Sequence, residues 1–262
     1  MSLTLTNIPG IMRHHGWNKA ATLMDRWFAG PAIETPRYNT PDQTTITMNW
    51  ALDFDRARGT YNRLIQNRIW ANPAAQNEIA SMLRRKNLLQ SATVRFGNFA
   101  GSVATLDADY INQRSMSGGS GARSGQYIGA YFGAHYSGYY PGYSGYYPGG
   151  GMDDMLAALG NFNFRVLVAG EVTPASGGGY DVTIQEIGVY LRDSYSFEGD
   201  QPLGFWDDSD NSVSAINFFS GTYVSNASFR DWRAANARGG DFLIYSDLRR
   251  TVLARPDVFH IA

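Results

Sequence analysis

The stretch YDVTIQEIGVYLRDSYSFEGDQPLGFW, Tyr180 to Trp206, decides the fold of this chain of 262 residues. It begins with a β-branched and apolar run, including Val182 and Ile184, which is typical of a strand. The run breaks at Arg192-Asp193, where a polar turn with several aromatic residues begins. Because a loop held by a strand presents polar groups that are both exposed and fixed, we expect reactive or binding residues here.

The sequence on either side of this stretch predicts further strands. Phe162 to Val172 has a strand pattern, and the glycine-rich turn from Pro174 to Gly179 joins it to the central strand as a hairpin. Downstream, the pattern predicts strands over Val213 to Val224, Asp241 to Tyr245 and Arg249 to Leu253, and a helix over about Ser228 to Ala237.

The N-terminal part predicts mainly helices. Apolar residues recur at helical spacing from Gly16 to Phe28, and two further helices are expected over Asp55 to Ala71 and from an Asn72 cap with Pro73 at its first position. We expect a strand over Thr44 to Leu52, and a strand pair over Thr93 to Phe99 and Ser102 to Leu106. Helices first and strands later predict an α+β fold, with the C-terminal part as an antiparallel sheet or a partly open β-barrel with one helix.

A low-complexity segment interrupts this order. Residues 117–151 contain 12 glycines and 8 tyrosines, and the pentapeptide Gly-Tyr-Tyr-Pro-Gly occurs twice. So little aliphatic surface predicts a mobile loop or linker, and an adhesive aromatic segment is the alternative. The resulting division is a mainly helical region at 1–91, a strand pair at 92–116, the Gly/Tyr-rich segment at 117–151 and a β-rich domain at 152–262.

Composition excludes several classes of function. The 22 Lys and Arg residues balance 23 Asp and Glu residues, so no global charge attracts nucleic acid. No cysteine is present for disulfides or thiolate metal sites. The sequence predicts neither a transmembrane helix nor a signal peptide, so we expect a cytoplasmic protein whose export, if any, does not use such a signal. The oligomeric state stays open.

The common catalytic motifs are absent, since the sequence has no GxSxG, no HExxH and no phosphate-binding GxxxxGK[ST]. Acidic residues after the central strand include Asp193, Glu198 and Asp200, and carboxylates are ligands for Mg²⁺ or Ca²⁺. The alternative is a solvated acidic loop that keeps a sheet edge soluble. The candidate binding residues are Trp206, Glu198, Trp17 and Trp27, although the two tryptophans on the N-terminal helix also suit a core.

Three segments resemble an uncharacterised bacterial family whose genes often lie beside type VI secretion components and their toxins. They are IPGIMRHHGWNKAATLMDRWF from Ile8, EIGVYLRDSYSFEGDQPLGFWD from Glu186 and SFRDWRAANARGGDFLIYSDL from Ser228. The matches span the chain apart from the Gly/Tyr-rich segment. The resemblance implies a secretion context, with a secretion spike or a neighbouring effector or immunity protein as partner.

The C-terminal part also resembles the catalytic domain of colicin M-type bacteriocins. Those enzymes cleave a lipid-linked cell-wall precursor with a divalent cation, using an Asp-x-Tyr-Asp motif. Asp193 and Tyr195 match the motif, whereas its second Asp falls on Ser196, and a later His-Arg pair falls on Pro202 and Leu203. The resemblance implies catalytic roles for Asp193 and Tyr195, and the departures remove a carboxylate and an imidazole that such an enzyme uses as a metal ligand or for proton transfer.

Three hypotheses follow. The first is a type VI secretion-associated antibacterial effector, a metal-assisted phosphodiesterase-type hydrolase with Asp193 and Asp200 at a Mg²⁺ or Ca²⁺ ion, acting in the periplasm of a target cell. The second is a non-catalytic adaptor that binds a secretion partner. The third is a self-assembling structural subunit.

Overall fold

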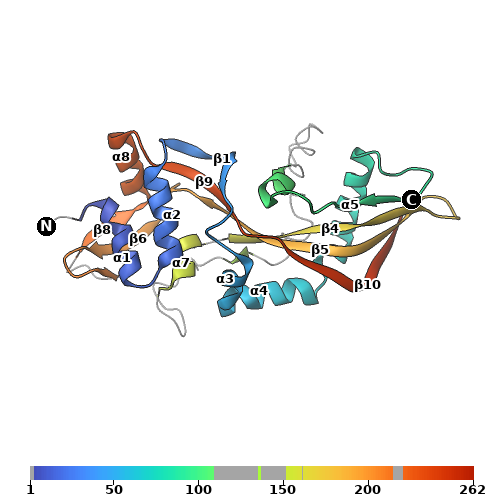
Figure 1. Cartoon of the computed structure of the whole chain (residues 1–262), viewed down its shortest axis with the longest axis horizontal. Helices are drawn as coiled ribbons and strands as arrows, with labels where there is room; N and C mark the ends of the chain where they lie inside the picture. Colours follow the sequence, from blue (N-terminus) through green and yellow to red (C-terminus); the bar gives the residue numbers. More distant parts are fainter. Residues whose placement is uncertain (1–2, 109–134, 137–151, 161, 215–220) are drawn as a thin grey trace. The chain divides into compact units, whose positions relative to one another are not determined.

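The computed structural model describes residues 3–108, 135–136, 152–160, 162–214 and 221–262 (Figure 1). The chain forms two compact units, each built from separate parts of the sequence. The first unit comprises Met1–Ile46, Ser137–Phe162 and Asp193–Ile244, and the second comprises Thr47–Tyr136, Asn163–Arg192 and Tyr245–Ala262. The longest strand, β5 (Tyr180–Tyr195), contributes residues to both units.

The first unit combines helices with short strands. Its helices are η1 (Leu5–Asn7), α1 (Ile8–His14), α2 (Asn18–Ala29), α7 (Asp154–Leu159) and α8 (Asn226–Asn236). Strand β1 (Ile33–Asp42) pairs in parallel with β9 (Gly240–Tyr245). Strands β6 (Pro202–Asp207), β7 (Ser212–Ser214) and β8 (Thr222–Ser225) form an antiparallel sheet with β6 in the centre.

The second unit is an antiparallel sheet with helices. Strand β4 (Phe162–Pro174) forms the expected hairpin with β5, and β10 (Arg249–Ile261) and β2 (Val94–Phe96) flank this pair. β3 (His135–Tyr136) also pairs with β4. The helices are α3 (Met48–Asp53), α4 (Asp55–Gln66), η2 (Ile69–Ala71), α5 (Pro73–Arg85) and a helical turn at 103–108.

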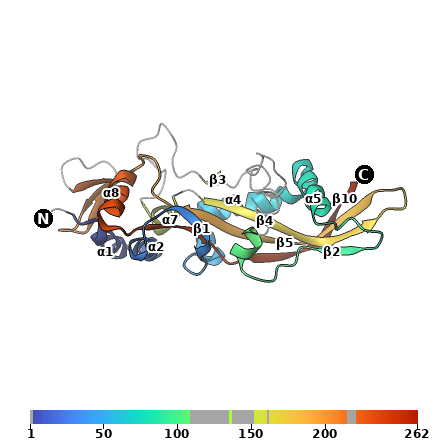
Figure 2. The same cartoon turned by 90° about the horizontal axis from the view of Figure 1, so that it is seen from above.

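The two faces of β4 contact different helices because side chains alternate along a strand. Phe164 packs against Tyr61 of α4, with ring centroids 5.9 Å apart. The next residue, Arg165, reaches Asp107 of the 103–108 helix. Figure 2 shows α4 and α5 on the same side of the β4–β5 hairpin. The hairpin is therefore the layer on which the rest of the second unit packs.

These elements confirm the predicted α+β class: helices come first, the antiparallel sheet comes late, and the described strands do not close into a barrel. The predicted Asn72 cap is confirmed, because its side chain accepts a hydrogen bond from the Ala75 N–H at 2.8 Å. The Gly/Tyr-rich segment lies outside the described residues, except for β3. No helix in the described parts of the chain is long and apolar enough to cross a membrane.

Two predicted strands are wrong, and capping explains both. Thr47 caps α3 by accepting a hydrogen bond from the Trp50 N–H at 3.2 Å, so the second half of the predicted Thr44 to Leu52 strand is helical. Ser102 accepts a bond from the Thr105 N–H at 3.2 Å, and residues 103–108 are helical. β-branched residues beside a Ser or Thr cap thus gave a false strand pattern.

The predicted helix over Asp55 to Ala71 is also wrong in one respect, since it is broken rather than continuous. α4 ends at Gln66, and Arg68 adopts a left-handed backbone with φ of 44° before η2 begins. A helix cannot continue through that conformation.

Candidate functional site

The end of β5 places Asp193 and Tyr195 in the first unit, where they have different surroundings. Asp193 is half-buried, whereas Tyr195 is only 8% exposed. The Tyr195 ring stacks on Phe242 and meets Phe197 edge-on, with centroid distances of 5.2 and 5.6 Å. Burial, and secondly the charge of Asp193, raise the pKa of the Tyr195 phenol well above its usual range. Tyr195 is therefore a neutral residue of an aromatic core.

The loop after β5 carries the other predicted carboxylates. Asp200 is exposed and forms an ion pair with Arg230 of α8 at 3.0 Å, and the same guanidinium donates to the Phe197 carbonyl oxygen at 2.9 Å. The Glu198 side chain is exposed, and its backbone carbonyl accepts a bond from Asn226 at 2.6 Å. These contacts tie the loop to α8.

Among the residues that the structure describes, no group of three or more His, Asp or Glu side chains lies close enough together to hold a metal ion. That search does not cover a site of two carboxylates, so the Mg²⁺ or Ca²⁺ site at Asp193 and Asp200 stays a prediction. Trp206, proposed to bind a ligand, is buried, and its indole donates to the Leu203 carbonyl oxygen at 2.9 Å.

The two N-terminal tryptophans belong to the core of the first unit. Trp17 is buried and stacks on His15, with centroids 4.9 Å apart. Trp27 is fully buried, and its indole donates to Asp241 at 2.8 Å. Arg233 donates to the same oxygen of Asp241 at 2.5 Å and lies over the Trp27 ring.

This arrangement explains the titration of Asp241. Burial raises its pKa to about 6, against the opposing effects of the bonds from Trp27 and Arg233. Trp27 and Asp241 are thus joined at the centre of the first unit.

The second unit contains a buried charged cluster that the sequence did not indicate. The Asp107 carboxylate is inaccessible to solvent and accepts hydrogen bonds from Arg165 and Tyr190 at one oxygen. Its other oxygen accepts a bond from the Tyr245 hydroxyl at 2.7 Å and lies 3.2 Å from the Arg192 guanidinium. Burial, and secondly Asp107, raise the pKa values of Tyr190 and Tyr245, so both phenols stay protonated and donate.

The cluster joins three strands to the helix at 103–108. Arg165 comes from β4, Tyr190 and Arg192 come from β5, and Tyr245 ends β9. Arg165, Tyr190 and Tyr245 each donate a hydrogen bond to the Asp107 carboxylate, and Arg192 forms an ion pair with it. We therefore assign the cluster to stability and not to chemistry.

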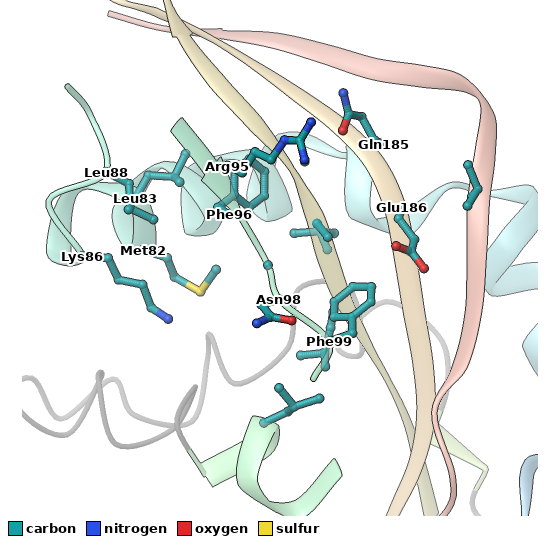
Figure 3. A pocket seen from close by; sticks show the side chains of 17 residues that line it. Met82, Leu83, Lys86, Leu88, Arg95, Phe96, Asn98, Phe99, Gln185 and Glu186 are labelled. Carbon is teal, nitrogen blue, oxygen red and sulfur yellow. The ribbon is translucent and has the colours of Figure 1, made fainter. Parts of the chain in front are cut away.

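A groove of about 850 Å³ lies in the second unit (Figure 3). Its apolar lining comes from five parts of the unit: the end of α5, β2 and the loop after it, the 103–108 helix, β4 and β10. Among these side chains are Leu83, Leu88, Phe96, Phe99, Leu167 and Val252. This volume lies within the range of roughly 300–1,000 Å³ that is typical of small-molecule sites.

Glycine at position 97 allows the groove to form. Its φ is +76°, and a Cβ at this position would collide with the carbonyl oxygen of Val168 on β4. The chain leaving β2 can therefore lie directly on β4, so that the following residues, Asn98 and Phe99, line the groove.

Polar groups are few in the lining, and one of them is a cation that has no partner among the described residues. Glu186 and Arg250 form a double ion pair, with distances of 2.7 and 3.0 Å. Arg95 is exposed and makes no hydrogen bond or ion pair with any residue that the structure describes. Figure 3 shows its side chain extending toward the strand that carries Gln185. The groove thus combines apolar walls with an available guanidinium.

These observations define the chain as an α+β protein with two compact units and an open apolar groove. The chain belongs to a family of unknown function, DUF6402, whose model matches residues 3–222 and 220–261. A search of curated proteins and a search of solved structures each gave no match.

Proposed function

We propose that the chain is a non-catalytic binding protein that works beside type VI secretion components, as an adaptor for a secretion spike or a neighbouring effector or immunity protein. The observation that carries this proposal is the groove of the second unit, where apolar walls surround Arg95. Concave apolar sites with a few polar groups are typical of ligand binding. The secretion context comes from the resemblance of the three segments described above.

The contacts of Tyr195, predicted as a catalytic residue, and of Asp200, predicted as a metal ligand, also support binding over hydrolysis. Tyr195 is packed between Phe197 and Phe242, and Asp200 is paired with Arg230. Both side chains therefore have structural roles where they lie. The alternative, an antibacterial effector that cleaves a lipid-linked envelope substrate, depends on Asp193 and on the resemblance to colicin M-type enzymes.

Two valines on β10 allow a matched test of this proposal. Val252 and Val258 are 76% and 63% exposed, and only Val252 lines the groove. When the tagged chain is purified from its bacterial host, we expect Val252→Asp to recover about tenfold less of the secretion component than the wild type. A loss of this size is expected when a central binding contact is removed. Val258→Asp should retain the complex, as should Asp193→Ala. Quantitative mass spectrometry of the purified complexes measures the difference.

The same variants distinguish the adaptor from the alternative function, the antibacterial effector. If periplasm-directed wild-type protein kills cells and Asp193→Ala abolishes killing while the protein stays folded, the adaptor proposal fails. Equal recovery of the partner with Val252→Asp and Val258→Asp would also contradict it.

A further inference from the structure

The walls of the groove are mainly apolar side chains, and the strands beneath them are paired with one another. Under the groove, β4 pairs with β5 through Leu167↔Gly188 and Ala169↔Glu186, and β2 pairs with β4 through Phe96↔Gly170. A bound peptide would bring one N–H and one C=O per residue, and burying these groups without partners costs free energy. An alkyl chain has no such groups. The walls therefore favour an alkyl chain over a peptide.

The charges of the groove favour a negative head group. Glu186 is the only acidic residue among the lining residues, and hydrogen bonds from Arg250 lower its pKa below the ordinary value. Its charge is thus present at neutral pH and matched by Arg250. Arg95 and Lys86 also line the groove, and Arg95 has no partner within the described residues. The lining is therefore cationic beside an apolar floor.

The form of the groove favours one free molecule over a membrane surface. Its volume of about 850 Å³ suits a ligand of small-molecule size. Its apolar side chains line a concave surface, whereas insertion into a bilayer uses an apolar face that projects from the protein.

We propose that the groove of the second unit binds an anionic amphiphile with a single acyl chain, whose carboxylate or phosphate head group pairs with Arg95 while the chain lies along Leu83, Phe96 and Leu167. This inference rests on the proposed binding function and names the class of ligand for the same groove. A guanidinium is well suited to such a head group, because it donates two parallel hydrogen bonds to a carboxylate or phosphate.

The test is calorimetric titration of the full chain with dodecanoate below its micelle concentration. Dodecyltrimethylammonium, with the same chain and the opposite charge, is the probe control. We expect dodecanoate to bind the wild type, and Arg95→Gln to weaken this binding about tenfold, as expected when a charge-assisted hydrogen bond is lost. Arg255→Gln is the matched variant, since Arg255 is an exposed arginine of β10 outside the groove, and it should bind dodecanoate as the wild type does.

Several results would overturn the inference. The inference is wrong if folded wild-type protein does not bind dodecanoate, or if it binds the two probes equally. It is also wrong if Arg95→Gln and Arg255→Gln have equal effects on dodecanoate binding. Binding to phosphatidylglycerol vesicles without binding to monomeric dodecanoate would likewise contradict it. If dodecanoate fails to bind but Val252→Asp still releases the secretion partner, the adaptor proposal stands and only the ligand class is wrong. Circular dichroism melts confirm that each variant is folded.

Discussion

Replacing Asp107 by asparagine is expected to lower the free energy of unfolding of the second unit by about 3–5 kcal/mol, the range for breaking a buried ion pair from one side. Asparagine has nearly the same shape, so the change removes the charge and little packing. Arg165, which is 1% exposed, and the largely buried Arg192 would then face an uncharged amide. Tyr190 and Tyr245 donate to different oxygens of Asp107, so only one of the two phenols would keep its acceptor in the asparagine variant. The loss would therefore report on the uncompensated arginine charges together with one lost phenol hydrogen bond.

The measurement is urea denaturation followed by circular dichroism, with Asp181→Asn as the control. Asp181 is an exposed carboxylate of the same unit that faces His260 at 3.0 Å. Exposed ion pairs contribute only about 0–1 kcal/mol, so this variant should unfold close to the wild type. If Asp107→Asn and Asp181→Asn lowered the free energy of unfolding by the same small amount, the buried Asp107 cluster would not stabilise the second unit as expected.

Replacing Trp27 by alanine is expected to destabilise the first unit by about 3–5 kcal/mol, as for other large aromatic residues truncated in a core. The indole is completely buried between α2 and α8, where it meets Phe197 and Phe229 at centroid distances of 4.9 and 5.5 Å. Its loss would also leave Asp241 with Arg233 alone. A large loss of stability would indicate that Trp27 acts in the core of the first unit, whereas the sequence suggested that it binds a partner.

Tyr223→Ala is a suitable control for Trp27→Ala, because Tyr223 is an aromatic residue of the same unit and is 51% exposed. Surface substitutions of this kind usually change stability by about 0.5 kcal/mol or less. Thermal melts of the two variants provide the comparison. If Trp27→Ala melts at the same temperature as the wild type but no longer binds the partner, Trp27 contributes to binding and not to the stability of the core.

Local patterns predicted most elements of the fold. The β4–β5 hairpin follows from two apolar runs joined by a glycine-rich turn, and α5 follows from Asn72 and Pro73. Strand β1 was not predicted, since its sequence IETPRYNTPD contains two prolines and few apolar residues. It forms by pairing with β9, which lies about two hundred residues away in the chain. Pairing over such a separation leaves no local pattern.

The candidate site was harder to predict for the same reason. Asp107 follows a segment with a strand pattern, and its partners on β4, β5 and β9 are far away in sequence. The groove combines residues near positions 83, 96, 106, 167 and 252, none of which forms a motif by itself. The predicted site at Asp193 came instead from the contrast between a strand and a polar turn. That contrast placed the end of the strand at Arg192-Asp193, whereas β5 continues to Tyr195, and it did not indicate how the side chains pack.

Hydrogen–deuterium exchange with and without dodecanoate tests most directly whether the groove is the working surface. The account predicts slower exchange at the end of α5, across residues 94–99 and in β4 near Leu167, because these segments line the groove. Arg95→Gln should remove that protection. Protection confined to residues 193–200 of the first unit, or no change anywhere in a folded protein, would contradict the account.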